Sequence, residues 1–157
     1  MEKRFIVDNT LGKLAKCLRA IGFDTIVFRS QDLHRLIQIS QEENRIILTR
    51  NRRLEPKLFL GNIVIVKEDK PDLQIGTVLR SLKLHVDSEK LLSRCLMCNE
   101  ELILIPRGEA EGTVPEFVFH AHTLFHRCPS CQRIYWEGTH PKNMKKKIEQ
   151  ILGDKIS

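Results

Sequence analysis

Long apolar segments are missing from this chain of 157 residues. No apolar stretch approaches the roughly 20 residues that a membrane-spanning helix needs. The N-terminus passes from charged residues at 2–4 straight into a short apolar run at 5–7, with no apolar segment of signal-peptide length and no small-residue cleavage site. We therefore expect a cytoplasmic protein that does not contact a membrane.

Cysteine is also scarce, with only 5 residues in the chain. The pairs Cys95/Cys98 and Cys128/Cys131 each have the spacing Cys-x-x-Cys, and a turn of this kind places two thiolates on one side of a tight loop. Cytoplasmic thiols stay reduced, so paired cysteines indicate a metal rather than disulfides. Two such turns complete a tetrahedral sulfur site, which predicts one structural Zn²⁺ ion in the C-terminal half.

Other interpretations of this half stay open. The four cysteines could form two disulfides or a redox pair, and Cys17 is expected to be a small buried residue within a helix. His120, His122 and His126 precede the second pair, either as metal ligands or as polar positions on short strands. The aromatic residues Tyr135 and Trp136 are expected to pack the ribbon against the first domain, with base stacking as the alternative.

Four apolar strand-like runs alternate with helical periodicity in the first half of the chain. Gly22 is expected to end the first helix, Ser30 to cap the second and Pro71 to open the last. This rhythm predicts an α/β fold with a parallel sheet and helices on both of its faces. The strand-like runs occupy residues 5–7, 25–28, 45–49 and 62–66, and a short helix is expected around 56–59.

The alternation stops near residue 85, where a polar connector begins. We expect an α/β domain at 1–85 and a small β-rich zinc ribbon at 93–141. A basic helix and tail are expected at 142–157, with apolar residues at 144, 148, 151 and 152.

Oxygen-bearing side chains follow the expected strands. Asp8 ends the first strand, Asp32 lies at the start of the second helix and Asn51 follows the third strand. Ligands of open parallel sheets gather at the carboxyl ends of the strands, and oxygen ligands suit Mg²⁺ or Mn²⁺. The alternative is that these residues only cap helices and turns.

The net charge is +6 and the sequence pI is about 9.2, which favours an anionic partner, most commonly nucleic acid. A solvated basic face is the alternative, and it is the interpretation that we favour for the lysine run at 145–147. The candidate RNA-binding residues are basic side chains near the expected carboxyl end of the sheet: Lys13, Lys16, Arg50, Arg52 and Arg53.

Several short motifs occur in a fixed order over nearly the whole chain. They lie at residues 5–8, 11–19, 22–25, 45–52, 93–99, 114–115, 127–129 and 135–140.

In this order, the motifs resemble the Mut-seven C-terminal RNase domain family, in which a PIN-like nuclease domain precedes a zinc ribbon. The resemblance implies catalytic acids at Asp8 and Asp32, which would hold Mg²⁺ or Mn²⁺. The third acid of the family is replaced here by Asn51, and this loses about one unit of negative charge at the site. Glu68 and Asp69 follow the fourth strand and are candidates to compensate for it.

The function expected from this resemblance is an RNA-directed, divalent-metal-dependent ribonuclease. Asp8 and Asp32 would hold the metal, and Asn51 would be a neutral ligand or would position a water molecule. A non-catalytic RNA-binding or protein-interaction module with a degenerate PIN-like site is the main alternative, and a redox or zinc-handling protein is a third.

Overall fold

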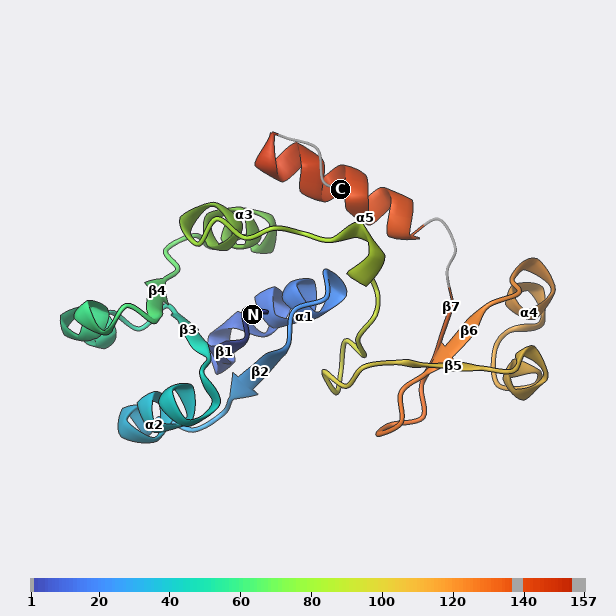
Figure 1. Cartoon of the computed structure of the whole chain (residues 1–157), viewed down its shortest axis with the longest axis horizontal. Coiled ribbons are helices and arrows are strands. Elements are labelled where there is room, and N and C mark those ends of the chain that lie inside the picture. The colour runs from blue at the N-terminus through green and yellow to red at the C-terminus, as the bar shows by residue number, and fades with distance from the viewer. Residues whose placement is uncertain (1, 137–139, 154–157) are drawn as a thin grey trace.

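The computed structural model describes residues 2–136 and 140–153 (Figure 1). Its first half contains a 4-stranded sheet with the order β2-β1-β3-β4. All neighbouring strands are parallel. This confirms the predicted α/β class. The strands are β1 (Phe5–Asp8), β2 (Thr25–Phe28), β3 (Ile46–Thr49) and β4 (Ile63–Ile65).

Helices cover both faces of this sheet because the strands are apolar on both faces. Phe5 and Val7 of β1 pack with α1 (Gly12–Ala20) and α3 (Pro71–Ser81) in one core cluster. Ile6, which points to the opposite face, packs in a second cluster with residues of α2 (Leu33–Glu43) and the 3₁₀ helix η2 (Arg52–Leu60). Figure 1 shows α3 and α2 on opposite sides of the strands.

The helix boundaries follow local capping chemistry. Gly22, with φ +98°, comes two residues after α1, and its N–H bonds to the Arg19 carbonyl. The expectation that Ser30 caps α2 is wrong. Asp32 is the N-cap, and the Ser30 hydroxyl instead accepts the N–H of Asp32. A carboxylate two residues later therefore sets the start of this helix.

The cysteine-rich part is a 3-stranded antiparallel sheet with the order β5-β6-β7. It has its own core around Phe125, against which Trp136 packs, so the expectation that Trp136 packs the ribbon against the first domain is wrong. The segment between the cysteine pairs also contains a helix that we did not predict. The elements are η3 (Ser88–Lys90), β5 (Ile103–Ile105), η4 (Arg107–Ala110), α4 (Glu116–Ala121), β6 (Phe125–Arg127) and β7 (Ile134–Trp136).

The last helix, α5 (His140–Leu152), returns to the first domain. Ile148 is 5% exposed and belongs to the core cluster of α1 and α3, and Met144, Ile151 and Leu152 pack against that cluster. Figure 1 shows α5 lying beside α3. The apolar stripe predicted for this helix is therefore confirmed, whereas the expected tail at 154–157 and the motif at 137–139 lie outside the described residues. None of the helices in the described part of the chain is both long and apolar enough to cross a membrane.

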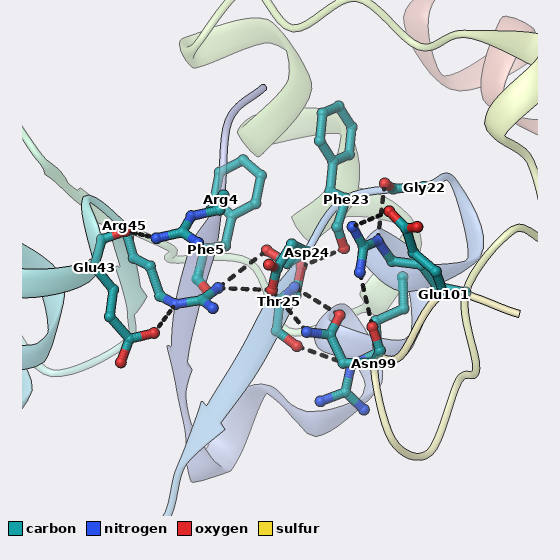
Figure 2. Close-up of polar contacts among 12 residues, drawn as sticks. Arg4, Phe5, Gly22, Phe23, Asp24, Thr25, Glu43, Arg45, Asn99 and Glu101 are labelled. Atoms are coloured by element: carbon teal, nitrogen blue, oxygen red, sulfur yellow. Dashed lines mark hydrogen bonds and ion pairs between the residues drawn. The ribbon is translucent and has the colours of Figure 1, made fainter. Parts of the chain in front are cut away.

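The first cysteine turn docks on the outer edge of β2, which is an edge strand. The amide oxygen of Asn99 accepts the Thr25 N–H at 2.9 Å, and its amide nitrogen donates to the Asp24 carboxylate at 2.7 Å (Figure 2). On the same outer edge, Nε of Arg19 donates to the Thr25 carbonyl at 2.8 Å. The outward-facing N–H and carbonyl of Thr25, which a further strand could have paired, are therefore bonded to side chains.

Arg45 extends this network across the sheet. Its guanidinium is 6% exposed and donates to the Asp24 carboxylate at 2.8 Å, to Glu43 at 2.9 Å and to the Phe5 carbonyl at 3.1 Å (Figure 2). Burial alone would raise the pKa of Asp24, but the hydrogen bonds from Arg45 and Asn99 lower it overall. The half-buried carboxylate of Asp24, directly before β2, thus connects Arg45, directly before β3, with the first cysteine turn.

Replacing Asn99 tests the docking. Asn99 has φ +69°, so Asn99→Gly removes the side chain without adding backbone strain. It leaves the Thr25 N–H without a partner and removes one of the two side-chain donors to the Asp24 carboxylate. We expect a loss of about 1–3 kcal/mol in the free energy of unfolding, measured by urea denaturation. The control Gln150→Ala, at an exposed position of α5, should change stability by less than about 0.5 kcal/mol. Equal values for both variants would contradict the docking role.

Candidate functional site

A hollow of about 360 Å³ lies at the carboxyl end of the sheet. Asp8 from the end of β1 and Asn51 from the segment after β3 both line it, as the position of their strands predicts. Leu33 and Leu36 of α2 form an apolar part of its wall, and Arg50 and Arg53 contribute positive charge. The hollow therefore combines a carboxylate, an amide and two cations.

Asp8 joins β1 to β3 through its side chain. One oxygen, Oδ2, accepts the Thr49 hydroxyl at 2.7 Å and the Arg50 N–H at 2.9 Å. The other, Oδ1, accepts the N–H and the hydroxyl of Thr10 at 2.9 and 2.5 Å. Burial alone would raise the pKa of Asp8, but these hydrogen bonds lower it below its usual value, so the group is an anion at neutral pH. A metal ion could bind only if a donor such as a threonine hydroxyl turns away.

Asp32 and Asn51 both act as caps. The Asp32 carboxylate accepts the N–H groups of His34 at 3.1 Å and Arg35 at 3.2 Å, and Asp32 is not among the residues lining the hollow. The Asn51 side-chain oxygen accepts the Arg53 N–H at 3.0 Å, which starts η2. Within 2–136 and 140–153, no three carboxylate, imidazole or thiol groups come together as metal ligands except the four cysteines.

The basic and acidic residues around the hollow are partly paired. Arg50 contacts the exposed Asp69 at 2.6 Å, and Arg52, which does not line the hollow, contacts Glu55 at 3.8 Å. Glu68 accepts the Thr77 hydroxyl of α3 at 2.7 Å, so its carboxylate is directed to that helix. Lys13 and Lys16 line a second hollow, and Asn9 lines both hollows.

The second cluster is the predicted four-cysteine centre. The sulfur atoms of Cys95, Cys98, Cys128 and Cys131 lie within 4.8 Å of one another. Cys95 and Cys128 are fully buried, and the other two are half-buried. Such a set of thiols can hold a metal ion such as zinc, with no ligand position left open for catalysis.

Hydrogen bonds within and around the four-cysteine centre shift the pKa values of its thiols in opposite directions. The hydrogen bond with Cys131 raises the pKa of Cys98 to about 12. The Arg133 N–H lowers the pKa of Cys131 to about 6. Four thiols this close cannot all ionise without a cation, and a divalent ion supplies the missing positive charge. The Tyr135 hydroxyl lies 3.0 Å from the Cys95 sulfur, so Tyr135 supports the centre from within the ribbon. Its expected packing against the first domain stays a prediction.

Comparison with known proteins agrees with this architecture. The family model described as "Mut7-C RNAse domain" matches residues 3–148. The chain belongs to the Mut7-C RNAse domain family. This confirms the resemblance that its motifs predict.

One relative of this Mut7-C chain is human "Exonuclease mut-7 homolog", which is 31% identical over 101 residues. The match covers 61% of this chain and 12% of the human protein, so this chain corresponds to a small part of that relative. No solved structure matches the chain. The description of the family names an RNase domain, and the name of the relative describes an exonuclease.

Several residues of the Mut7-C site were not predicted from the sequence. Thr10 and Thr49 hold Asp8, and Asn99 and Tyr135 position the first cysteine turn. Thr49 has a weak signal in the sequence, because it is the last residue of an apolar strand and therefore lies at the carboxyl edge of the sheet. The three histidines named above do not join the cysteine cluster. Cys17 lies in α1 against the core, as expected, but it is half-buried rather than buried.

Metal content tests the cysteine centre. Protein purified without added zinc should contain about one Zn²⁺ per chain, and Cys128→Ser should lose the metal and unfold the ribbon. Cys17→Ser is the matched control, because Cys17 is the only cysteine outside the cluster, and it should keep the metal. Elemental analysis and near-ultraviolet circular dichroism measure the two effects. Free titration of all four thiols in the native protein would refute the centre.

Acid unfolding tests the bonding of Asp8. Its pKa in the folded protein is below 3.8, so its stabilising contribution is complete above pH 3.8 and disappears as the pH falls through the folded value. Asp8→Asn should therefore lower the free energy of unfolding by about 1–3 kcal/mol at neutral pH, since an amide cannot accept all four hydrogen bonds. Urea titrations should show this difference shrinking well below pH 3.8. A constant difference across pH would contradict the role of the charge.

Proposed function

We propose that this chain is an RNA-directed, divalent-metal-dependent nuclease that hydrolyses phosphodiester bonds at the hollow beside Asp8. The observation that carries the proposal is that Asp8 and Asn51, from the ends of neighbouring strands, line one hollow with Arg50 and Arg53. The PIN-like character of the domain, a cytoplasmic location and Mg²⁺ or Mn²⁺ as the cofactor are parts of the same proposal. Family membership and the exonuclease relative support it.

The donor set fits a magnesium-type ion that keeps several water molecules. Mg²⁺ is commonly bound by one or two carboxylates together with substrate phosphates. Asp8 supplies the charged oxygen, and Asn51 supplies a neutral carbonyl oxygen or positions water. Such an ion would polarise a phosphate and activate water for its attack. Arg50 and Arg53 would hold phosphate oxygens beside it.

Asp32 has a less direct part in this proposal. It starts α2, whose residues Leu33 and Leu36 form a wall of the same hollow. Its carboxylate is exposed, and among the described residues it accepts two backbone N–H groups, so further ligand positions remain on its oxygens. Asp32 would join the metal when RNA and the ion are bound, as the family resemblance implies.

A second candidate function is favoured by the hydrogen bonds of Asp8. Four donors already occupy its oxygens, and Asn51 brings no charge. A module that binds RNA without cutting it would keep the basic residues and use Asp8 only to join β1 and β3. This alternative needs no metal at the hollow.

Cleavage of single-stranded RNA separates the two functions. Labelled RNA should be cut when Mg²⁺ or Mn²⁺ is added to the zinc-loaded protein, and Asp8→Ala should abolish cleavage while RNA binding remains. Glu109→Ala in the ribbon is a control of the same type and should cut normally. RNA binding without cleavage by the unaltered chain would establish the second function instead.

Position 51 offers a test by gain of function. Asn51→Asp adds a full negative charge at the hollow, and we expect Mg²⁺ affinity to rise about tenfold, because Coulomb attraction exceeds that of a carbonyl dipole even after screening. Calorimetry with Mg²⁺ measures the affinity, and RNase activity should rise with it.

The double variant that combines Asn51→Asp with Asp8→Asn should lose that gain. If the unaltered chain and the Asn51→Asp variant bind Mg²⁺ with equal affinity, position 51 is only a cap and the metal site lies elsewhere.

A further inference from the structure

A second hollow, of about 280 Å³, lies where α1, the end of β2 and the first cysteine turn meet. Lys13 and Lys16 contribute from α1, and Arg29 contributes from the residue after β2. Leu96 and Met97, which stand between Cys95 and Cys98, form the opposite wall. The hollow therefore has one wall from the nuclease-type domain and one from the metal-binding ribbon.

The charge of this hollow is of one sign. Its lining contains four cations and no carboxylate. Lys13, Lys16 and Arg29 are exposed, and in the part of the chain that the structure describes no ion pair is formed by any of them. Arg45, Arg50 and Arg52, by contrast, each contact a carboxylate. Unpaired positive charge in a concave site attracts anions.

The fourth cation, Arg19, fixes the two walls together. It is 8% exposed, and its guanidinium donates to the carbonyls of Leu96 at 2.7 Å and Met97 at 3.4 Å. Burial lowers the pKa of Arg19, but from a starting value so high that the group stays charged. Arg19 therefore holds the cysteine turn in place and adds to the positive potential of the hollow.

The second hollow continues from the first. Asn9, directly after β1, lines both of them. A polyanion with regularly spaced charges that occupies the hollow beside Asp8 would reach the four cations with its next phosphates. A single nucleic-acid strand has this property, and the half-exposed thioether of Met97 at the rim offers an apolar contact to its bases.

We propose that this hollow is a phosphate-binding subsite for single-stranded RNA and that the first cysteine turn forms one of its walls. The inference rests on the RNA-directed part of the proposed function, and not on cleavage. It assigns RNA contact to Arg29 and to the metal-binding ribbon, in addition to the lysines of α1. Because Leu96 and Met97 lie between two metal ligands, loss of the metal should also weaken RNA binding.

Gly12 allows a test that does not disturb the fold. It lines the hollow, has helical angles (φ −59°, ψ −37°), and a Cβ added there would meet no atom within 4 Å. The first turn of α1 contains no acidic residue, and the N-terminus of a helix favours one. Gly12→Glu therefore adds negative charge to the hollow while α1 keeps or gains stability, so the thermal midpoint should not fall.

The measurement is fluorescence anisotropy with a labelled oligouridine of about 12 nucleotides, without added Mg²⁺ or Mn²⁺ so that the RNA stays intact. Gly12→Glu should weaken binding about tenfold, and the slope of log affinity against log salt concentration should fall in magnitude by about 1. Arg29→Gln should weaken binding several-fold. Gly12→Gln, which has the same size as Gly12→Glu without the charge, should weaken binding much less than Gly12→Glu does.

The matched control is Gly108→Glu, which makes the same change at a ribbon position with equally open space. If Gly12→Glu and Gly108→Glu bind the oligouridine with equal affinity, the hollow is only a solvated basic face and the proposal is wrong. That result would leave the nuclease proposal intact if the chain still cuts RNA. Conversely, RNA that is bound through the hollow but never cut would overturn the nuclease proposal and leave the subsite standing.

Discussion

The outer edge of β2 is the constraint on which the arrangement of this protein depends. An open edge strand exposes unpaired peptide groups and invites pairing with another chain. Here the Thr25 peptide is satisfied on that side by the side chains of Arg19 and Asn99, not by another strand. Asn99 belongs to the first cysteine turn, so the metal-binding centre and the sheet are held in one geometry by the same few hydrogen bonds. The second hollow is formed because these hydrogen bonds hold Leu96 and Met97 of the cysteine turn opposite α1 and the end of β2.

The central strand β1 is held by polar groups at both ends. Arg45 binds the Phe5 carbonyl at the start of the strand, and Asp8 binds Thr49 and the Arg50 N–H at its end. This fixes the carboxylate before any ligand arrives, which is the preorganisation that an active site requires. The same hydrogen bonds compete with a metal ion for the oxygen lone pairs. The Asp8 side chain therefore stabilises the fold and, in the proposed function, also has to bind the metal ion.

Local signals in the sequence were sufficient for the parallel sheet of the first domain and for the metal centre, but not for α4 of the ribbon. Apolar runs and helical spacing predict the parallel sheet, and the two Cys-x-x-Cys pairs predict the thiol cluster. Contacts between distant residues carry no such signal, and Asn99 lies 74 positions from its partner Thr25. The role of Asp32 could not be predicted either, because a helix cap and a metal ligand use the same carboxylate at the same position. Trp136 was assigned to the wrong core because the side of a strand that faces each core depends on its pairing register.

The return of α5 to the first domain has a consequence for synthesis of the chain. Ile148 completes a core in which residues such as Leu14 and Ile75 precede it by more than 70 positions. During translation the sheet and its first helices therefore emerge with one apolar surface uncovered, and the whole ribbon must follow before α5 can close it. Because translation adds roughly 5–20 residues per second, this apolar surface of the nascent chain stays exposed for several seconds. A chaperone that binds exposed apolar surface would act on this protein mainly during that interval.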